Sequence, residues 1–313
     1  MGRVRAVCIS EKKGTEKIPV EQAEFLVNHG IKGDSHAGTW HRQVSLLSFD
    51  KVEEFNEKGG QVKDGDFGEN LLVEGMDFRT MPVGTQIFCG DVVLEITQIG
   101  KECHSHCAIR RRVGDCIMPR EGVFARVLNG GTIRPGDEME AAYPKPDRKL
   151  RAAVITMSDS GYRGEREDVS GPLCCRMLEQ AGYTVEEAVI LPDEKELLKH
   201  KLIYYADSRQ VDLVLTTGGT GFSLRDCTPE ATMEAGDRNA PGIAEAMRYA
   251  SLKVTKRAML GRGVSVLRKK TLIVNLPGSP KAVEESLGFI LDELDHGIRI
   301  LNGLTGECAQ KKR

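Results

Sequence analysis

The chain has 313 residues, of which 40% are hydrophobic and 29% charged. This composition is typical of folded domains, about two at this length, and excludes a disordered, collagen-like or coiled-coil chain. The formal net charge is −2, with −3 over residues 1–145 and +1 over the rest. Neither half has the basic excess of a general nucleic-acid-binding protein, so we expect no nucleic-acid partner.

Neither an apolar run of the roughly 18 residues that a membrane span needs nor a signal-peptide pattern is present. We therefore expect a cytoplasmic protein with no membrane partner. The nine cysteines are an odd number, which indicates free thiols in a reducing compartment and not a disulfide framework.

Short strands separated by glycine-rich turns dominate residues 1–142. Helical periodicity appears at 49–58 and at 124–128. Gly90-Asp91 forms a two-residue turn of the kind that joins hairpin strands. Many short strands with such turns predict a mainly β domain, a barrel or a sandwich. The strands are expected at 42–48, 85–89, 92–97 and 139–142.

Strands and helices alternate in the second half of the chain. Residues 143–149 contain two prolines among charged residues and are predicted to be a linker. A second domain then covers 150–302, and 303–313 form a tail. The alternation predicts an α/β doubly wound, mostly parallel sheet, which binds ligands beyond the carboxyl ends of its strands. The strands are expected at 152–157, 185–191, 211–217 and 271–276, and the helices at 171–181, 194–205, 243–254 and 281–300.

Four of these strands end in small or polar residues. Gly218-Gly219-Thr220-Gly221 follows one strand, and its small residues let backbone amides approach an anion closely. Pro277-Gly278-Ser279 follows another and leads into a helix, whose N-terminus favours anions. Ser158-Asp159 and Asp193 follow the remaining two. Each alone fits a tight turn with a helix cap, but four on one sheet edge predict a site for a phosphate-bearing ligand.

Two interpretations are open for each acidic residue near this edge. Asp193 either binds the ligand or caps the following helix, and Asp226 either binds it or forms an ion pair with Arg225. Asp159 either belongs to the site or only forms a turn. Thr228 is expected to cap the next helix.

The order of these motifs resembles the MogA/MoaB family over roughly residues 150–302. The resemblance implies a molybdopterin adenylyltransferase that uses ATP, Mg²⁺ and molybdopterin and assembles as a homotrimer or hexamer. It also implies that Asp193 and Asp226 are the catalytic, metal-binding carboxylates. By the same resemblance, the cofactor would be bound by Ser158, Asp159, Gly218, Gly219, Thr220, Gly221, Pro277, Gly278 and Ser279. The motifs are Ser158-Asp159-Ser160, Asp168-x-Ser170-Gly171-Pro172, Pro192-Asp193-Glu194, Thr216–Gly221, Arg225-Asp226-x-Thr228-Pro229-Glu230-Ala231, Pro241-Gly242 and Asn275–Lys281.

The first domain contains Cys103-His104-Ser105-His106-Cys107, followed by three arginines that begin at Arg110. On a strand the cysteines and histidines would face opposite ways, so a structural zinc site is the weaker interpretation. A thiol beside guanidinium groups has a lowered pKa, and arginine binds phosphate.

Other segments of the first domain resemble the MOSC domain, the family named after the C-terminal domain of molybdenum cofactor sulfurases. The resemblance covers roughly residues 1–142 and implies a barrel-like fold with a cysteine that handles sulfur or ligates molybdenum. Cys107 fits that catalytic position best, with Arg110 and Arg111 binding the cofactor, while Cys103 and Cys116 stay open. His36, Arg42, Glu69 and Asn70 either line the pocket or make structural hydrogen bonds. The segments are 33–36, 42–46, 66–71, 82–85 and 122–137.

Both resemblances point to molybdenum cofactor biosynthesis. We expect the second domain to adenylylate molybdopterin and the first to bind, carry or sulfurate the cofactor, with other proteins of the pathway or molybdoenzymes as partners. The alternative is a non-catalytic carrier or scaffold for the cofactor, because a fold alone does not establish an activity.

Overall fold

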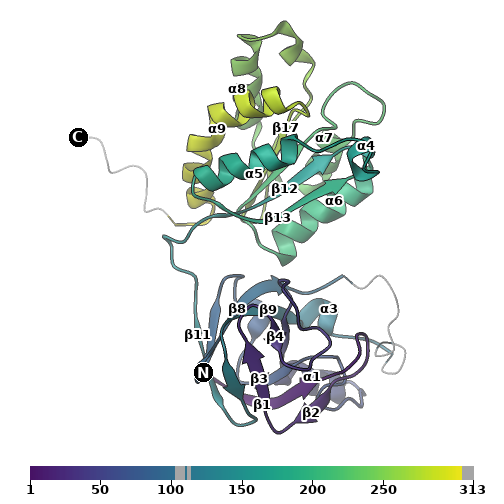
Figure 1. The fold of residues 1–313 in the computed structure, drawn as a ribbon, viewed down its shortest axis with the longest axis vertical. Coiled ribbons are helices and arrows are strands. Elements are labelled where there is room, and N and C mark those ends of the chain that lie inside the picture. The colour runs from purple at the N-terminus through teal and green to yellow at the C-terminus, as the bar shows by residue number, and fades with distance from the viewer. Residues whose placement is uncertain (103–109, 111–113, 305–313) are drawn as a thin grey trace, which may run out of the picture. The chain divides into compact units, whose positions relative to one another are not determined.

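The computed structural model describes residues 1–102, 110 and 114–304. The chain divides into two compact units, Met1–Lys145 and Pro146–Arg313, each with its own hydrophobic core (Figure 1). Among the described residues, no helix has the length and apolar character needed to cross a bilayer.

Seven strands in the described part of the N-terminal unit close into a barrel. Around the barrel they are β1 (Gly2–Ile9), β11 (Glu138–Ala142), β7 (Gln86–Cys89), β8 (Val92–Ile99), β9 (Val123–Asn129), β5 (Val44–Ser48) and β6 (Leu71–Glu74), which pairs with β1 again. Strand β2 (Ile18–Val20) extends β1, and β3 (Ala23–Leu26), β4 (Gly30–Ile31) and β10 (Gly131–Ile133) form a separate small sheet. The described part of the unit also contains the helices α1 (Phe49–Glu57) and α3 (Met118–Glu121) and the 3₁₀ turn η1 (Phe78–Thr80).

The barrel confirms the predicted mainly β fold, including the hairpin at Gly90-Asp91, where Cys89 pairs with Val92 and Gly90 has a φ of 56°. The predicted helix at 124–128 is wrong. These residues belong to β9, which pairs with β5 on one side and with β8 on the other. Val123, Phe124 and Ala125 are all buried, so the segment lacks the alternation that marks a half-exposed strand.

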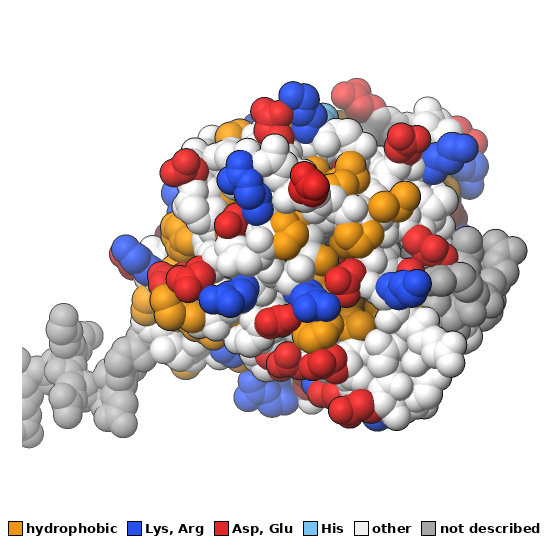
Figure 2. All heavy atoms as spheres, turned by 90° about the horizontal axis from the view of Figure 1, so that it is seen from below, with side chains coloured by type: hydrophobic (Ala, Val, Ile, Leu, Met, Phe, Trp, Pro, Cys, Tyr) orange, Lys and Arg blue, Asp and Glu red, His pale blue; other side chains and the backbone are white. Residues whose placement is uncertain are grey.

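Both charges are mixed on one face of the molecule. On the face shown in Figure 2, lysine and arginine side chains lie interspersed with aspartate and glutamate side chains. The described residues on that face therefore form no continuous basic patch.

The C-terminal unit contains a six-stranded sheet within its described residues. Its order is β13 (Thr184–Leu191), β12 (Arg151–Met157), β14 (Leu213–Thr217), β17 (Thr271–Leu276), β16 (Ser265–Arg268) and β15 (Arg238–Asn239). The first four strands are parallel, and β16 is antiparallel to both of its neighbours.

Successive side chains of these strands point to opposite faces of the sheet, and each face has its own hydrophobic core. Ala152 and Val154 of β12 join the core under one set of helices, whereas Ala153 and Ile155 join the other. This arrangement confirms the predicted doubly wound sheet. The first face is covered by α5 (Ser170–Gln180), α8 (Pro241–Leu252) and α9 (Pro280–Leu301), and the second by α6 (Lys195–Ile203), the π turn η2 (Tyr204–Ser208) and α7 (Thr228–Ala235). The short α4 (Asp159–Tyr162) and the 3₁₀ turn η3 (Lys256–Leu260) lie in connecting segments.

Candidate active site

The loop Gly218–Gly221 leaves the carboxyl end of β14 in a conformation that only glycine adopts easily. Gly218 and Gly219 have φ values of 95° and 63°. A Cβ on Gly218 would lie 2.3 Å from the carbonyl oxygen of Met157, and one on Gly219 would lie 2.4 Å from Oγ1 of Thr228. The two glycines are therefore required both by the backbone angles and by the close packing of neighbouring atoms.

Every carbonyl of this loop is already hydrogen-bonded. Thr228 donates its hydroxyl to Gly218 O (2.9 Å) and its amide to Gly219 O (3.1 Å). Arg262 donates its amide to Thr220 O (2.9 Å) and its Nε to Gly221 O (2.6 Å). The amides of Gly219, Thr220 and Gly221 donate to no other described residue. A loop whose carbonyls are bound and whose amides are free has donors available for an anion.

Thr228 is thus not the helix cap that the sequence suggested. Helix α7 begins at Thr228 itself, with Cys227 at the N-cap position and no side chain capping it. The hydroxyl of Thr228 instead supports the glycine loop. By contrast, Ser279 caps α9 as expected, accepting a hydrogen bond from the amide of Ala282 at 3.3 Å.

Asp193 and Asp226 flank the same loop. A Cβ added to Gly219 would lie 3.2 Å from Oδ1 of Asp193. A Cβ added to Gly221 would lie 2.8 Å from Oδ2 of Asp226. Burial raises the pKa of Asp193, and the negative charges of Asp159 and Asp226 add to the rise, while a backbone hydrogen bond from Asp159 opposes it. Oδ1 of Asp193 is buried and has no hydrogen-bond partner among the described residues.

The structural alternatives for these two aspartates are wrong. Arg225 does not pair with Asp226; it binds both carboxylate oxygens of Asp159, at 3.1 and 3.0 Å, and Oε1 of Glu194 at 3.1 Å. The N-cap of α6 is Glu194, so Asp193 does not occupy that position. Asp226 accepts one hydrogen bond, from the amide of Ser223 at 3.1 Å. Arg225 lowers the pKa of Asp159, which is the first residue of α4.

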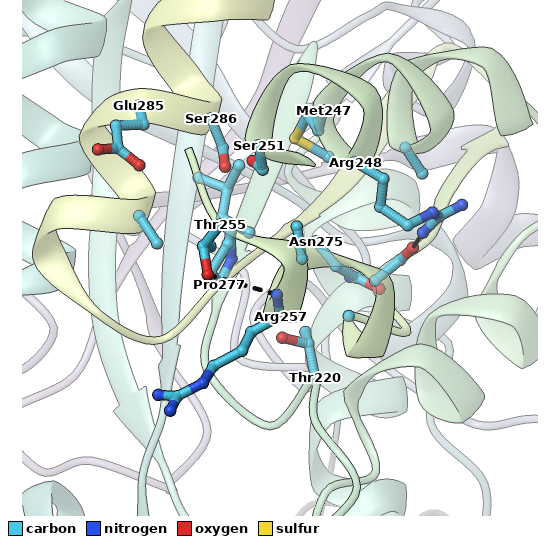
Figure 3. A pocket seen from close by; sticks show the side chains of 16 residues that line it. Thr220, Met247, Arg248, Ser251, Thr255, Arg257, Asn275, Pro277, Glu285 and Ser286 are labelled. Carbon is cyan, nitrogen blue, oxygen red and sulfur yellow. Dashed lines mark hydrogen bonds between the residues drawn. The ribbon is translucent and has the colours of Figure 1, made fainter. Parts of the chain in front are cut away.

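Two cavities share the glycine loop and the turn after β17. One of about 330 Å³ is lined by Ser158, Gly218, Gly278 and Ser279 among others. The second, of about 250 Å³, is lined by Thr220 and Pro277 and by side chains from α8, η3 and α9 (Figure 3). Neighbouring residues of one loop therefore face two different cavities. Six of the predicted cofactor-binding residues line one cavity or the other, whereas Asp159, Gly219 and Gly221 line neither.

The carboxylates fit a divalent cation. Mg²⁺ is usually held by one or two carboxylates together with phosphate oxygens. Asp193 offers a buried oxygen without a partner among the described residues, and Asp226 lies close enough to raise its pKa. No group of three or more histidine, cysteine or acidic residues in the described ranges could hold a metal by itself. A cation here would therefore depend on oxygens from a bound phosphate.

Several residues of the site were not predicted. Arg262 holds the loop and the carbonyl of Asp226 (2.8 Å) and pairs with Glu230. Arg166 lines the first cavity, and Arg248 and Arg257 line the second. Arg248 donates to the carbonyl of Gly263 at 2.8 Å, and the amide of Arg257 donates to Thr255 at 3.3 Å. Arg166 and Arg262 lie in irregular segments, Arg257 in a 3₁₀ turn and Arg248 on α8, and a solvent-exposed role is the ordinary expectation for a single arginine.

The four candidate pocket residues of the N-terminal unit differ in burial and in their contacts. Asn70 bonds to the amide and hydroxyl of Ser45 and to the carbonyl of Cys8, and is buried, so its role is structural. Glu69 is fully buried and accepts from the amide of Gly65 at 2.7 Å. His36 and Arg42 are half-buried.

Only part of the predicted cysteine site lies within the described residues. Cys103, Cys107 and Arg111 lie outside the described residues. The carbonyl of Arg110 accepts a hydrogen bond from the amide of Gly114 at 2.9 Å. Cys116 is buried in a hydrophobic cluster. A reactive thiol needs access to its reagent, so burial argues against Cys116 as the functional cysteine.

Comparisons with known proteins find relatives for both units. Residues 153–296 match the family model of a probable molybdopterin binding domain, and residues 33–140 match that of the MOSC domain. A protein of Helicobacter pylori strain J99 named molybdopterin adenylyltransferase is 38% identical over 156 residues, which are 49% of this chain and 89% of the relative. One of Escherichia coli K12 with the same name is 40% identical over 145 residues, which are 46% of this chain and 74% of the relative.

The chain belongs to the molybdopterin adenylyltransferase family. The crystal structure of the molybdopterin biosynthesis enzyme MoaB from Thermus thermophilus is similar too, with 44% sequence identity and a TM-score of 0.47, covering 49% of this chain and 97% of that one. Membership of the molybdopterin adenylyltransferase family rests on the C-terminal unit, while the N-terminal unit is a MOSC domain.

Proposed function

We propose that the C-terminal unit transfers the adenylyl group of ATP to molybdopterin. The terminal phosphate oxygen of molybdopterin attacks the α-phosphorus of ATP, the bond from that phosphorus to the bridging oxygen breaks, and pyrophosphate leaves. The observation that carries this proposal is the pair Asp193 and Asp226 beside a glycine loop with free amides. The names of the relatives support the same reaction.

The main obstacle to this reaction is the repulsion between two anions, so catalysis requires charge neutralisation and in-line positioning. The amides of Gly219, Thr220 and Gly221 hold phosphate oxygens. Asp193 and Asp226 would hold Mg²⁺, which supplies positive charge to the triphosphate. The two cavities fit two substrates that react across the shared loop, and their arginines balance further negative charge.

The test uses the full-length chain with ATP, Mg²⁺ and molybdopterin. Pyrophosphate and adenylylated pterin should appear in equal amounts. Binding of molybdopterin without pyrophosphate release would instead favour the carrier or scaffold function. The same mixture without ATP serves as the inactive reference.

The N-terminal MOSC unit is proposed to bind, carry or sulfurate the cofactor through Cys107. Cys103 stays a possible alternative, and the burial of Cys116 argues against that residue. Replacing each cysteine by serine in the full-length chain separates the three. Cys107→Ser should abolish the sulfur or molybdenum chemistry without changing adenylyl transfer, and the same loss in Cys116→Ser alone would contradict the choice.

The C-terminal unit is also proposed to assemble as a homotrimer or hexamer. Supporting this are five large apolar residues of the α8–η3 segment that are 42–65% exposed in the isolated chain: Tyr249, Leu252, Val254, Met259 and Leu260. Light scattering of the purified protein measures the assembly, and a monomer at micromolar concentration would contradict it. Partners in the cofactor pathway and a cytoplasmic location stay predictions from the sequence.

A further inference from the structure

The only tryptophan of the chain, Trp40, lies close to two positive charges in the N-terminal unit. The guanidinium carbon of Arg42 is 4.7 Å from the centroid of the indole ring, and Nζ of Lys13 is 5.8 Å from it. Arg42 is also 5.6 Å from the ring centroid of Phe124. A guanidinium group that lies over aromatic rings keeps its N–H donors in its own plane, where they can bind a ligand.

Neither cation is neutralised by a described residue. Lys13 and Arg42 form no ion pair within the described part of the chain, and Nε of Arg42 is buried there without a hydrogen-bond partner. Two other half-buried arginines, Arg268 and Arg148, have acidic partners in Asp207 and Asp212. Two unpaired cations on one ring therefore leave a local positive charge that an anion would satisfy.

The loop that carries Trp40 is fixed at its start by a buried ion pair. Lys17 and Asp34 pair with side chains no more than 1% exposed, and Asp34 also accepts hydrogen bonds from the amides of Ser10 and His36, both at 3.0 Å. The indole Nε1 of Trp40 then donates to the carbonyl of His36 at 2.8 Å. The ring is thus held in place by main-chain and buried polar contacts.

The residues on both sides of Arg42 are anchored to the barrel. The carbonyl oxygen of His41 accepts a hydrogen bond from the hydroxyl of Thr97, on β8. Nε2 of the His41 ring lies 2.8 Å from Oε1 of Gln98, also on β8. Oε1 of Gln43 accepts the amide of Val127, on β9, at 2.9 Å. The backbone that carries Arg42 is therefore fixed before any ligand arrives, which lowers the entropic cost of binding.

We propose that Arg42 and Lys13, on the ring of Trp40, form a binding site for a phosphate monoester in the N-terminal unit. Arginine binds phosphate through two parallel hydrogen bonds, and lysine adds a point charge. The site does not depend on adenylyl transfer. Three compounds could supply the phosphate group: molybdopterin, a nucleotide or free phosphate. Only the choice of molybdopterin rests on the proposed function.

Because Trp40 is the only tryptophan, its fluorescence reports on this site within the full-length chain. Inorganic phosphate, AMP and molybdopterin are titrated at constant ionic strength while indole emission is recorded. We expect a saturable change in emission with at least one of them. Arg42→Gln and Lys13→Gln should each weaken binding, by about tenfold for the arginine. Arg134→Gln, which removes an exposed arginine bound to Gln22, should have no effect.

The three probes distinguish the sources. Equal responses to all three mean that the phosphate group alone is recognised, whereas a response to molybdopterin only, or to AMP only, names that compound as the ligand. A response matched by added chloride, no saturable response to any probe, or a response unchanged in both Arg42→Gln and Lys13→Gln would overturn the proposal. Lys13→Gln leaves Arg42 and Trp40 in place, so it tests the site even if Arg42→Gln does not fold.

The outcome is separable from that for adenylyl transfer. Asp226→Asn should retain the indole response while it loses pyrophosphate release. A chain with no pyrophosphate release but a saturable indole response would overturn the proposed reaction and support this site.

Discussion

Asp159 and Asp193 exchange two hydrogen bonds, in which the amide of each donates to the carboxylate of the other at 3.1 Å. This reciprocal pair joins the loop after β12 to the loop after β13. It occupies Oδ2 of Asp193 and leaves Oδ1 beside the glycine loop. The orientation of the candidate metal ligand is therefore set by the fold.

Asp193→Asn should have opposite effects on activity and on stability. Loss of the metal-binding charge should lower adenylyl transfer by at least about 100-fold. A carboxyl whose pKa is raised by folding destabilises the fold when it is ionised, so the neutral amide should raise the melting temperature at neutral pH. That gain should vanish in acid below the usual carboxyl pKa. Calorimetry across pH measures it, and a lower melting temperature for the variant at neutral pH would contradict this account.

Asp226→Asn should abolish pyrophosphate release with little change in stability. The amide oxygen of asparagine can still accept the hydrogen bond from Ser223, so only the charge is lost. The exposed Asp292 on α9 gives a matched control, and Asp292→Asn should keep full activity. If Asp226→Asn also keeps full activity, Asp226 is not a metal ligand.

Gly219→Ala tests the glycine loop. The positive φ and the contact with Thr228 should cost about 1–3 kcal/mol in the free energy of unfolding and should raise KM for both anionic substrates. Gly242→Ala adds the same methyl group where no atom lies within 4 Å and should leave KM unchanged. Equal KM values for the two variants would show that the loop does not bind the substrates. Denaturant unfolding and steady-state kinetics provide the measurements.

Arg262→Lys should keep the charge but lose the loop geometry. One ammonium group cannot replace the guanidinium contacts with Gly221, Asp226 and Glu230 together. We expect KM for ATP to rise several-fold while the fold stays intact by circular dichroism. Arg163→Lys, at an exposed pair with Glu165, should behave like the unchanged protein. An unaltered KM in Arg262→Lys would remove this positioning role.

Glu69→Gln should remove a pH dependence of the N-terminal unit. Burial raises the pKa of Glu69 from its ordinary value near 4.5 to about 7. Between these values the folded state binds a proton that the unfolded state does not, so stability falls as pH rises through this interval and levels off above about pH 7. The variant should lack this fall. Thermal unfolding at several pH values checks it, and parallel curves for both proteins would refute the assignment.

The sequence was sufficient to bring the main site together, because parallel strands place their carboxyl ends at one sheet edge. Ser158, Asp193, Gly218 and Ser279 were expected there for that reason. The sequence did not predict the contact between Arg262 and the glycine loop. Arg262 follows a 3₁₀ turn and reaches Gly221, 41 positions earlier in the chain, only through the tertiary fold.

The errors in the sequence analysis have similar causes. The run 124–128 is only five residues long and buries Phe124, Ala125 and Val127, and so short a run has no period that separates a strand from a helix. Thr228 has the residue type of a cap, but its hydroxyl finds the carbonyl of Gly218 instead, a contact made across ten positions of sequence. Strand β16 is only four residues long and gave no recognisable signal.

The bound carbonyls of Gly218–Gly221 have a kinetic consequence. The four carbonyl groups of this loop form their hydrogen bonds when the protein folds. The loop backbone therefore needs little rearrangement when a phosphate binds to its amides. Association should then occur in a single exponential phase whose rate is proportional to nucleotide concentration, with no slow isomerisation step afterwards.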